Sequence, residues 1–391
     1  MKTQQSTLRR MWLGKAAIAG FAVAALGAGS AAGGADDTAP PTRSIAYVLT
    51  TINWPIYQAK DASGKETKEE CPNGINDGAR EQFSASFPQK DGKKWTIAET
   101  TVMREAEIWW PTVEADKFPF REVGGKVAIG LNLDGKVKPS DFTSPDGKIT
   151  GIDNQFYRAV GCILSYRDGS SQNLFENEHF EGKQFNRILF ELTDVDSLLN
   201  DDDVTMTTYR GLDPLVRDAK GEFQADTTQR IDTQWGQDFI HKSKAKIVNG
   251  VLTTTEPSDF VWANEFVHQE ASLDWMRDAH FELKLTPDTA EGMLGGYIDI
   301  ETNYRSLNRR YGTHQISYGK TAAASLYKAL RRLADAHPDS ETGANTAISA
   351  ALRITAVQVR LTHPKEKVAE MEIDKPARFA ARGEDTKIQT R

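Results

Sequence analysis

The chain has 391 residues, of which 39% are hydrophobic and 26% charged, with a formal net charge of −7 and two cysteines. This acidic balance argues against nucleic acid and anionic lipid as partners, because both carry negative charge themselves. The sequence also lacks the phosphate-binding patterns GxGxxG and GxxxxGK[ST], the nucleophile elbow GxSxG, the zinc motif HExxH and the haem motif CxxCH. We therefore expect neither a nucleotide nor a haem cofactor.

The N-terminal region has the three parts of a secretory signal peptide. Residues 1–15 contain no acid and four basic side chains, which are Lys2, Arg9, Arg10 and Lys15. An apolar core from Ala16 to about Ala28 follows, and it is shorter than the roughly 20 apolar residues of a membrane span. Small residues come next, so we expect cleavage after Ala32 or after Ala35. Loss of the signal takes the formal charge from −7 to −11.

The export signal predicts a periplasmic or secreted protein with no membrane span. The Arg9–Arg10 pair leaves two routes open. One is the general secretory route, and the other is the twin-arginine route, in which the cargo crosses the membrane already folded. Outside the cytosol an even number of cysteines favours a disulfide, so we predict a bridge between Cys71 and Cys162.

Alternation of apolar and polar residues predicts a mainly β protein. Runs with a period of two occur at 127–133, 188–192, 204–208, 281–285 and 357–361, and turn-rich loops separate them. Two pairs of runs read as antiparallel hairpins: RILFEL with VTMTTYRG, and HFELKL with LGGYIDIE. Within the last run, Gly295 and Gly296 predict a bulge or a close backbone approach.

One helix is predicted over about 320–336, where apolar residues recur at helical spacing and Pro338 follows. Residues 346–353 read as a second, short helix. The predicted fold is an antiparallel β-sandwich of jelly-roll or lectin-like type with a smaller α/β C-terminal part. Its predicted segments are a signal (1–32 or 1–35), a linker (36–43), the sandwich (44–265), the C-terminal part (266–364) and a charged tail (365–391).

Two acidic loops are candidate calcium sites, because calcium prefers six to eight oxygen ligands from carboxylates, amides and carbonyls. The first contributes Asp141, Asp146, Asp153 and Asn154, and the second contributes Asp194, Asp196, Asp201 and Asp203. Neither matches the EF-hand pattern. The alternative is that these side chains form solvated turns, since Asp and Asn bond nearby backbone amides and SPDG is a natural type I turn.

Glu105 and Glu107 are the candidate catalytic residues, because residues i and i+2 share one face of a strand and Trp109 and Trp110 follow them. Such a pair suits glycoside hydrolysis, which needs two carboxyl groups flanking the scissile bond. The leading interpretation is nonetheless non-catalytic: an exported envelope protein that binds a glycan, an envelope polymer or a protein partner, or has a structural role, with calcium in its acidic loops. The alternatives are a secreted polysaccharide hydrolase and an accessory subunit of an exported enzyme complex.

Overall fold

The computed structural model describes most of the chain between residues 43 and 364. The described ranges are 43–76, 91–93, 102–104, 107–109, 120–182, 187–233, 236–264, 272–304 and 323–364. The predicted signal peptide, residues 36–42 of the predicted linker and the predicted tail 365–391 lie outside these ranges. The chain from Thr42 onward forms one compact unit.

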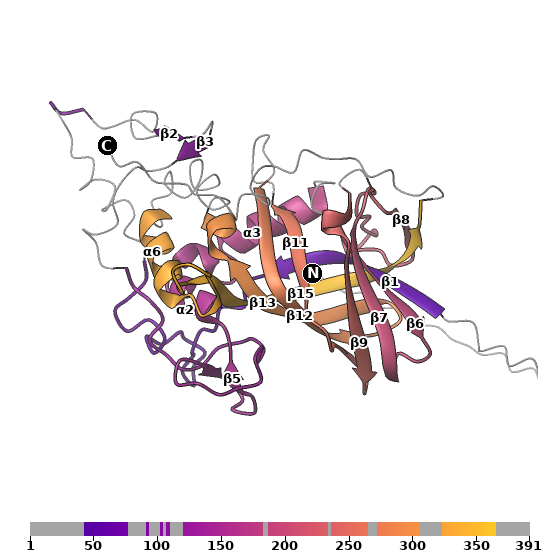
Figure 1. The fold of residues 1–391 in the computed structure, drawn as a ribbon, viewed down its shortest axis with the longest axis horizontal. Helices are drawn as coiled ribbons and strands as arrows, with labels where there is room; N and C mark the ends of the chain where they lie inside the picture. Colours follow the sequence, from indigo (N-terminus) through magenta and orange to yellow (C-terminus); the bar gives the residue numbers. More distant parts are fainter. Residues whose placement is uncertain are drawn as a thin grey trace, which may run out of the picture. The chain divides into compact units, whose positions relative to one another are not determined.

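The fold is mainly β, and its antiparallel sheet closes into a barrel (Figure 1). Closure follows because β1 pairs with β6 on one side and with β15 on the other. The eight strands of the ring, counted over the described ranges, are in spatial order β1 (Arg43–Asn53), β6 (Ile188–Val195), β7 (Asn200–Arg210), β9 (His241–Val248), β10 (Val251–Thr254), β12 (Ser272–Leu285), β13 (Thr289–Asp299) and β15 (Asn345–Thr362). The predicted two-sheet sandwich is not confirmed, because one sheet returns to its own first strand instead of facing a second sheet.

The remaining elements extend or cover this ring. Three further strands join the same sheet: β8 (Thr227–Arg230), β11 (Ser258–Asn264) and β14 (Ala336–Pro338). Two small hairpins stand apart from it: β2 (Val102–Arg104) with β3 (Glu107–Trp109), and β4 (Phe142–Thr143) with β5 (Thr150–Ile152). The helical elements are α2 (Gln155–Val160), η3 (Leu164–Tyr166), α3 (Ser171–Gly182), η5 (Gln237–Phe239) and α6 (Ala323–Leu333).

Alternate side chains from the strands point into the barrel and contribute to the main hydrophobic core. The side chain of Tyr47, in β1, points into the barrel. Its hydroxyl donates a hydrogen bond of 2.7 Å to the carbonyl oxygen of Thr286, in the turn between β12 and β13. Because neither of these strands pairs with β1, the bond crosses the barrel interior. One row of paired residues crosses five neighbouring strands and consists of Ile247, Leu252, Leu283, Gly292 and Ile354. Its four apolar side chains belong to the main hydrophobic core.

The outer face of the barrel carries a second layer. Near β1, Ala46, Val48, Leu189 and Val359 pack under Ile231, which follows β8. Over β13, the segment around Leu131 and Leu133 lies so close that a Cβ at Gly295 would be 3.0 Å from one leucine and 3.1 Å from the other. The predicted close backbone approach is confirmed at Gly296, where a Cβ would be 2.9 Å from the Arg277 carbonyl oxygen, whereas leucine side chains approach Gly295. The facing strand β12 carries a bulge between Arg277 and His280.

Both predicted hairpins are confirmed as β6–β7 and β12–β13, and the predicted long helix is confirmed as α6. Two local predictions are wrong. Residues 127–133 do not form a strand. They form an irregular segment in which the alternating residues Leu131 and Leu133 pack against Gly295 of β13. Residues 346–353 are not helical but lie in the first half of β15, which pairs with β13 from Ala347 onward, because sheet pairing overrides the helix propensity of its alanines. The predicted boundary at 265 falls between β11 and β12, which pair with each other.

We expect Leu283→Ala to lower the free energy of unfolding by about 2–5 kcal/mol, because it leaves a cavity at a fully buried position inside the barrel. Leu199→Ala is the matched control: this side chain is 61% exposed, and we expect a change within about 0.5 kcal/mol. Denaturant titration of both variants measures the difference. Equal effects of the two substitutions would contradict the assignment of Leu283 to the barrel interior.

Candidate functional site

The first acidic loop uses its polar side chains to build turns and a helix cap. Asp141 accepts a hydrogen bond from the Lys138 amide, and Asp146 accepts bonds from the Ser144 hydroxyl and the Lys148 amide. Asn154 is the N-cap of α2, where its side-chain oxygen accepts from the Tyr157 amide. These contacts match the turn-forming alternative, because each side chain is bonded to backbone close by in sequence.

Asp153 differs from the rest of that loop because its side chain is only 2% exposed. One carboxylate oxygen accepts bonds from the amides of Leu133 (2.8 Å) and Asp134 (3.4 Å), and the other lies 3.9 Å from the Lys138 ammonium. Burial, with a smaller contribution from the charges of Asp134 and Asp141, raises the pKa of Asp153 to about 6. The group therefore changes charge in a mildly acidic range.

The second acidic loop is shorter than expected, since Asp201 and Asp203 already belong to β7. Asp201 accepts bonds from the amides of Asp196, Ser197 and Asp203, and so closes the turn between β6 and β7. Asp203 forms an exposed ion pair with Lys244 at 2.6 Å. Asp194, in β6, has a positive φ of 63°, a conformation that Asp tolerates better than most residues.

The two acidic loops lie against different strands. The first follows the segment that packs on β13, and the second joins β6 to β7, which are three and four strands away from β13 around the ring. Within the part of the chain that the structure describes, no three His, Cys, Asp or Glu side chains form a group that can hold a metal ion. Calcium binding at these eight residues stays a prediction, because backbone carbonyls and water are also calcium ligands.

The candidate catalytic pair is not tested. Glu105 lies outside the described residues, and Glu107 begins the short strand β3 with a side chain that the structure does not describe. The tryptophans give a partial answer: Trp54 and Trp262 are buried in the core. Those two residues therefore do not supply an exposed platform for sugar stacking.

The structure instead assembles a polar cluster on the outer face of β13 and β15. Asp335 accepts bonds from both the amide (2.7 Å) and the hydroxyl (2.6 Å) of Ser349, and the same hydroxyl accepts from the Gln155 amide at 2.9 Å. Tyr297 pairs with Ser349 across the two strands. Burial raises the pKa of Asp335, and burial together with the charges of Asp153 and Asp335 raises the pKa of Tyr297.

An accessible His–Asp pair borders this cluster. The Nε2 atom of His337 lies 3.0 Å from an Asp278 carboxylate oxygen, and the imidazole ring packs edge-on against Tyr297 at 5.7 Å. Both partners have positive φ, 54° at His337 and 47° at Asp278, a conformation that costs energy for residues other than glycine. The bulge in β12 and the short strand β14 therefore present these two side chains to each other, at the rim of the buried carboxyl groups.

Sequence reasoning did not find this cluster, because its members come from four segments that meet only in the fold. Asp335 follows a helix, Ser349 lies in a run that reads as helical, and Tyr297 looks like any strand residue. One signal was available: Leu294, Gly296 and Ile298 alternate with Tyr297, which predicts that Tyr297 faces away from the barrel interior.

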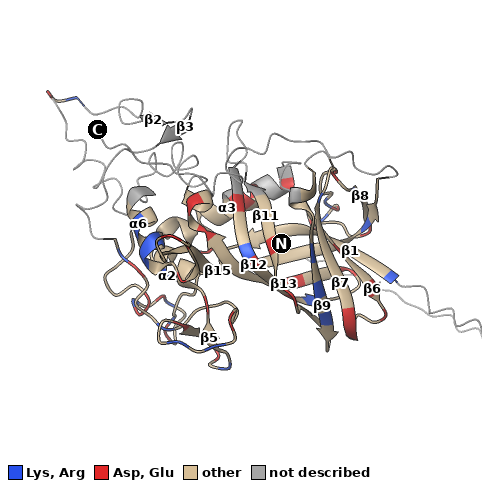
Figure 2. Ribbon diagram, viewed as in Figure 1, with Lys and Arg blue, Asp and Glu red and all other residues tan. Residues whose placement is uncertain are grey.

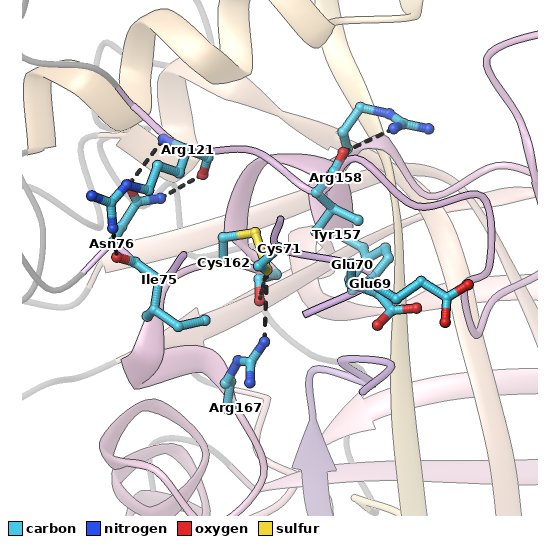
Figure 3. Close-up of a disulfide and its surroundings, with 12 residues drawn as sticks. Glu69, Glu70, Cys71, Ile75, Asn76, Arg121, Tyr157, Arg158, Cys162 and Arg167 are labelled. Carbon is cyan, nitrogen blue, oxygen red and sulfur yellow. Dashed lines mark hydrogen bonds between the residues drawn. A yellow bond between two sulfur atoms is a disulfide. The ribbon is translucent and has the colours of Figure 1, made fainter. Parts of the chain in front are cut away.

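The predicted disulfide is confirmed: Cys71 and Cys162 are bonded (Figure 3). Cys71 precedes a turn in which the Gly74 amide donates to its carbonyl oxygen, and Cys162 directly follows α2. The Arg167 guanidinium lies 3.7 Å from the sulfur of Cys71 and also forms an ion pair with Glu66. Because 91 positions separate the two cysteines, the chain-entropy model gives the bridge about 4–5 kcal/mol of stabilisation.

No protein-family model, no curated protein and no solved structure matches this chain. Among the helices that the structure describes, none combines the length and the apolar character needed to cross a membrane. Function must therefore be argued from the residues and contacts themselves.

We expect Asp153→Asn to change how stability depends on pH. The pKa of Asp153 is raised from 3.8 to about 6 in the folded chain, so the folded state binds this proton more tightly than the unfolded state. The raised pKa stabilises the folded state by on the order of 2 kcal/mol below about pH 4, and this stabilisation is lost between pH 4 and 6. Relative to wild type, Asp153→Asn should gain that amount between pH 4 and 7, as measured by thermal unfolding.

Asp146→Asn is the control of opposite sign. Hydrogen bonds from Ser144 and Lys148 lower the pKa of Asp146 to about 2, so its contribution is present above the unfolded pKa and is lost as the pH falls. This variant should lose stability relative to wild type as the pH rises. A parallel pH dependence of wild type and Asp153→Asn would show that Asp153 is not the titrating group.

Proposed function

We propose that this chain is exported and acts outside the cytosol as a binding or structural module of a bacterial envelope. The observation that carries the proposal is the bridge between Cys71 and Cys162, which lies in the hydrophobic core. Disulfides of this kind persist in oxidising compartments and are rare in a reducing cytosol. The basic, apolar and small-residue segments of residues 1–35 support the same compartment.

The filled barrel supports a role for the outer surface of the protein. Small-molecule sites are commonly concave and lined by apolar side chains. Here the inward positions of the ring hold side chains such as Tyr47, Phe190 and Leu283, which pack against one another. A partner would then be recognised on the outside, and the Asp278–His337 pair beside Tyr297 is one place on that surface where polar side chains meet.

Charge adds a constraint on such a partner. The surface carries basic and acidic stripes side by side, with Lys242, Lys244 and Lys246 exposed along β9 and acids at the start of β7 (Figure 2). Since the Lys244–Asp203 pair joins the two stripes, neither sign dominates that face. A neutral glycan or envelope polymer, or a protein partner, fits this mixed surface. The polysaccharide hydrolase and the accessory subunit stay alternative predictions, and a glycan-binding screen with a parallel hydrolysis assay separates the first from a binding module.

Calcium is the cofactor that the acidic loops suggest, and we expect millimolar calcium to raise the melting temperature and a chelator to lower it. The reason is the density of carboxylates at 134–153 and 194–203. At a concentration ten times the dissociation constant, a single site adds about 1.4 kcal/mol to the free energy of unfolding. Magnesium at equal concentration is the control for ionic strength. A melting curve unchanged between calcium and chelator would remove calcium from the proposal.

The export proposal predicts that the mature chain lies outside the cytosol, begins after Ala32 or Ala35 and carries no free thiol. Cell fractionation, N-terminal sequencing and maleimide labelling after denaturation measure the three properties. Val23→Arg should hold the precursor inside the cell, because it places a charge in the apolar core of the signal. Val23→Leu is the matched control and should be exported normally. Wild-type protein that stays cytosolic with two free thiols would refute the proposal.

A further inference from the structure

Both sulfurs of the disulfide are enclosed by the folded chain. Cys71 is 5% exposed and Cys162 is 0% exposed. Both cysteines belong to the main hydrophobic core, of which Val123, Tyr157 and Val160 are also members. On the remaining side, the Arg167 guanidinium lies over the sulfur of Cys71 (Figure 3). A folded chain therefore presents neither sulfur to a protein-sized reagent.

The enclosure is made by three segments that bond to one another around the bridge. Asn76 and Arg121 exchange hydrogen bonds between the Asn76 side chain and the Arg121 backbone, and the Asn76 amide donates to the carbonyl oxygen of Cys162. The Gly124 amide donates at 2.8 Å to the carbonyl oxygen of Glu70, the residue before Cys71. These bonds hold the residues next to both cysteines, so an opening that exposes a sulfur must break several of them together.

Disulfide formation has an access requirement that this enclosure does not meet. Two thiols must lose two protons and two electrons, and the electrons go to an oxidant that is itself a disulfide and is reduced to two thiols. The step runs through a mixed disulfide: one thiolate of the chain attacks a sulfur of the oxidant and expels the oxidant's other sulfur as a thiolate. The second thiolate of the chain then attacks the chain sulfur of the mixed disulfide, forms the Cys71–Cys162 bond and expels the oxidant's remaining thiolate. In the folded chain, neither Cys71 nor Cys162 has room for that intermediate.

We infer that Cys71 and Cys162 are oxidised by a disulfide-bearing protein oxidant before residues 120–167 close over them, so that the chain crosses the membrane unfolded and reduced. This inference rests on the proposed export and selects its route. The twin-arginine route carries cargo that has already folded. A chain that folded in the reducing cytosol would reach the oxidant with both thiols buried. Arg9 and Arg10 therefore serve only as the basic part of an ordinary export signal.

Thiol reactivity in vitro tests the access argument. The full mature chain is reduced in denaturant, returned to native buffer with reductant, freed of reductant, and exposed to dithiobis(nitrobenzoic acid). The reference for an accessible thiol is Val137→Cys in a Cys71→Ser/Cys162→Ser background, since Val137 is 69% exposed. We expect Cys71 and Cys162 to react at least about 100-fold more slowly than that reference in native buffer, and within about threefold of it in denaturant.

Each outcome of that experiment is decisive. A slow native reaction supports the inference, and so does a reduced chain whose near-ultraviolet circular dichroism shows that it does not fold, because closure then depends on prior oxidation. A reduced chain that folds and reacts as fast as the Val137→Cys reference overturns it.

The route is tested in cells with Arg9→Lys/Arg10→Lys, which keeps the charge of the signal but removes the arginine pair. We expect this variant to be exported and oxidised like wild type. Cytosolic retention of this variant, with wild type exported, would overturn the inference while leaving the proposed export intact. Cytosolic retention of wild type itself would instead defeat the proposed function, so the two failures are distinguishable.

Discussion

The pairing of β1 with β15 is the constraint on which the rest of the fold depends. It joins residues about 300 positions apart, in a register that runs from Ala46 opposite Val359 to Asn53 opposite Arg353. Buried hydroxyl contacts between Thr50 and Thr355 strengthen it at the position where the register shifts. With β1 also paired to β6, the ring strands have neighbours on both sides, which satisfies backbone groups that an edge would leave open. Closure also encloses the inward side chains, so polar contacts collect on the outside.

Glycines in β13 let the second layer approach the barrel closely. A Cβ at Gly295 would press against Leu131 and Leu133, and one at Gly296 would lie 2.6 Å from the Met276 side chain and 2.9 Å from a backbone oxygen of β12. The loop before α2 therefore lies directly on the sheet. This close approach buries Asp153 at a depth where desolvation outweighs its two amide hydrogen bonds, and so explains why its pKa rises while that of the exposed Asp146 falls.

The polar cluster and the disulfide are linked through the same loop and helix. Gln155, the first residue of α2, donates to Ser349, and Cys162 follows the last turn of that helix. The bridge to Cys71 thus fixes one end of a short helix whose other end bonds to β15. A six-residue helix has little intrinsic stability, so these contacts at both ends maintain it and hold Asp153, two residues before it, in place.

The sequence by itself determined the features that depend on neighbouring residues. The helical spacing of α6, the alternation and turns of β6–β7 and β12–β13, and the close approach at Gly296 all follow from local sterics and from which face must be buried. Two cysteines and a predicted export signal were enough to predict the bridge. In each case the interacting residues are close together in the sequence or, as for the two cysteines, have only one possible partner.

Only the tertiary structure decided the closure of the sheet, the strand over 346–353 and the cluster around Tyr297. Alternation states which side chains are buried but not whether the sheet that buries them is stacked or closed, so sandwich and barrel look alike in sequence. The alanines of β15 favour a helix until β13 supplies strand pairing along them. Burial raises the pKa values of Asp153 and Asp335, and burial is decided by how the chain packs and not by a local pattern.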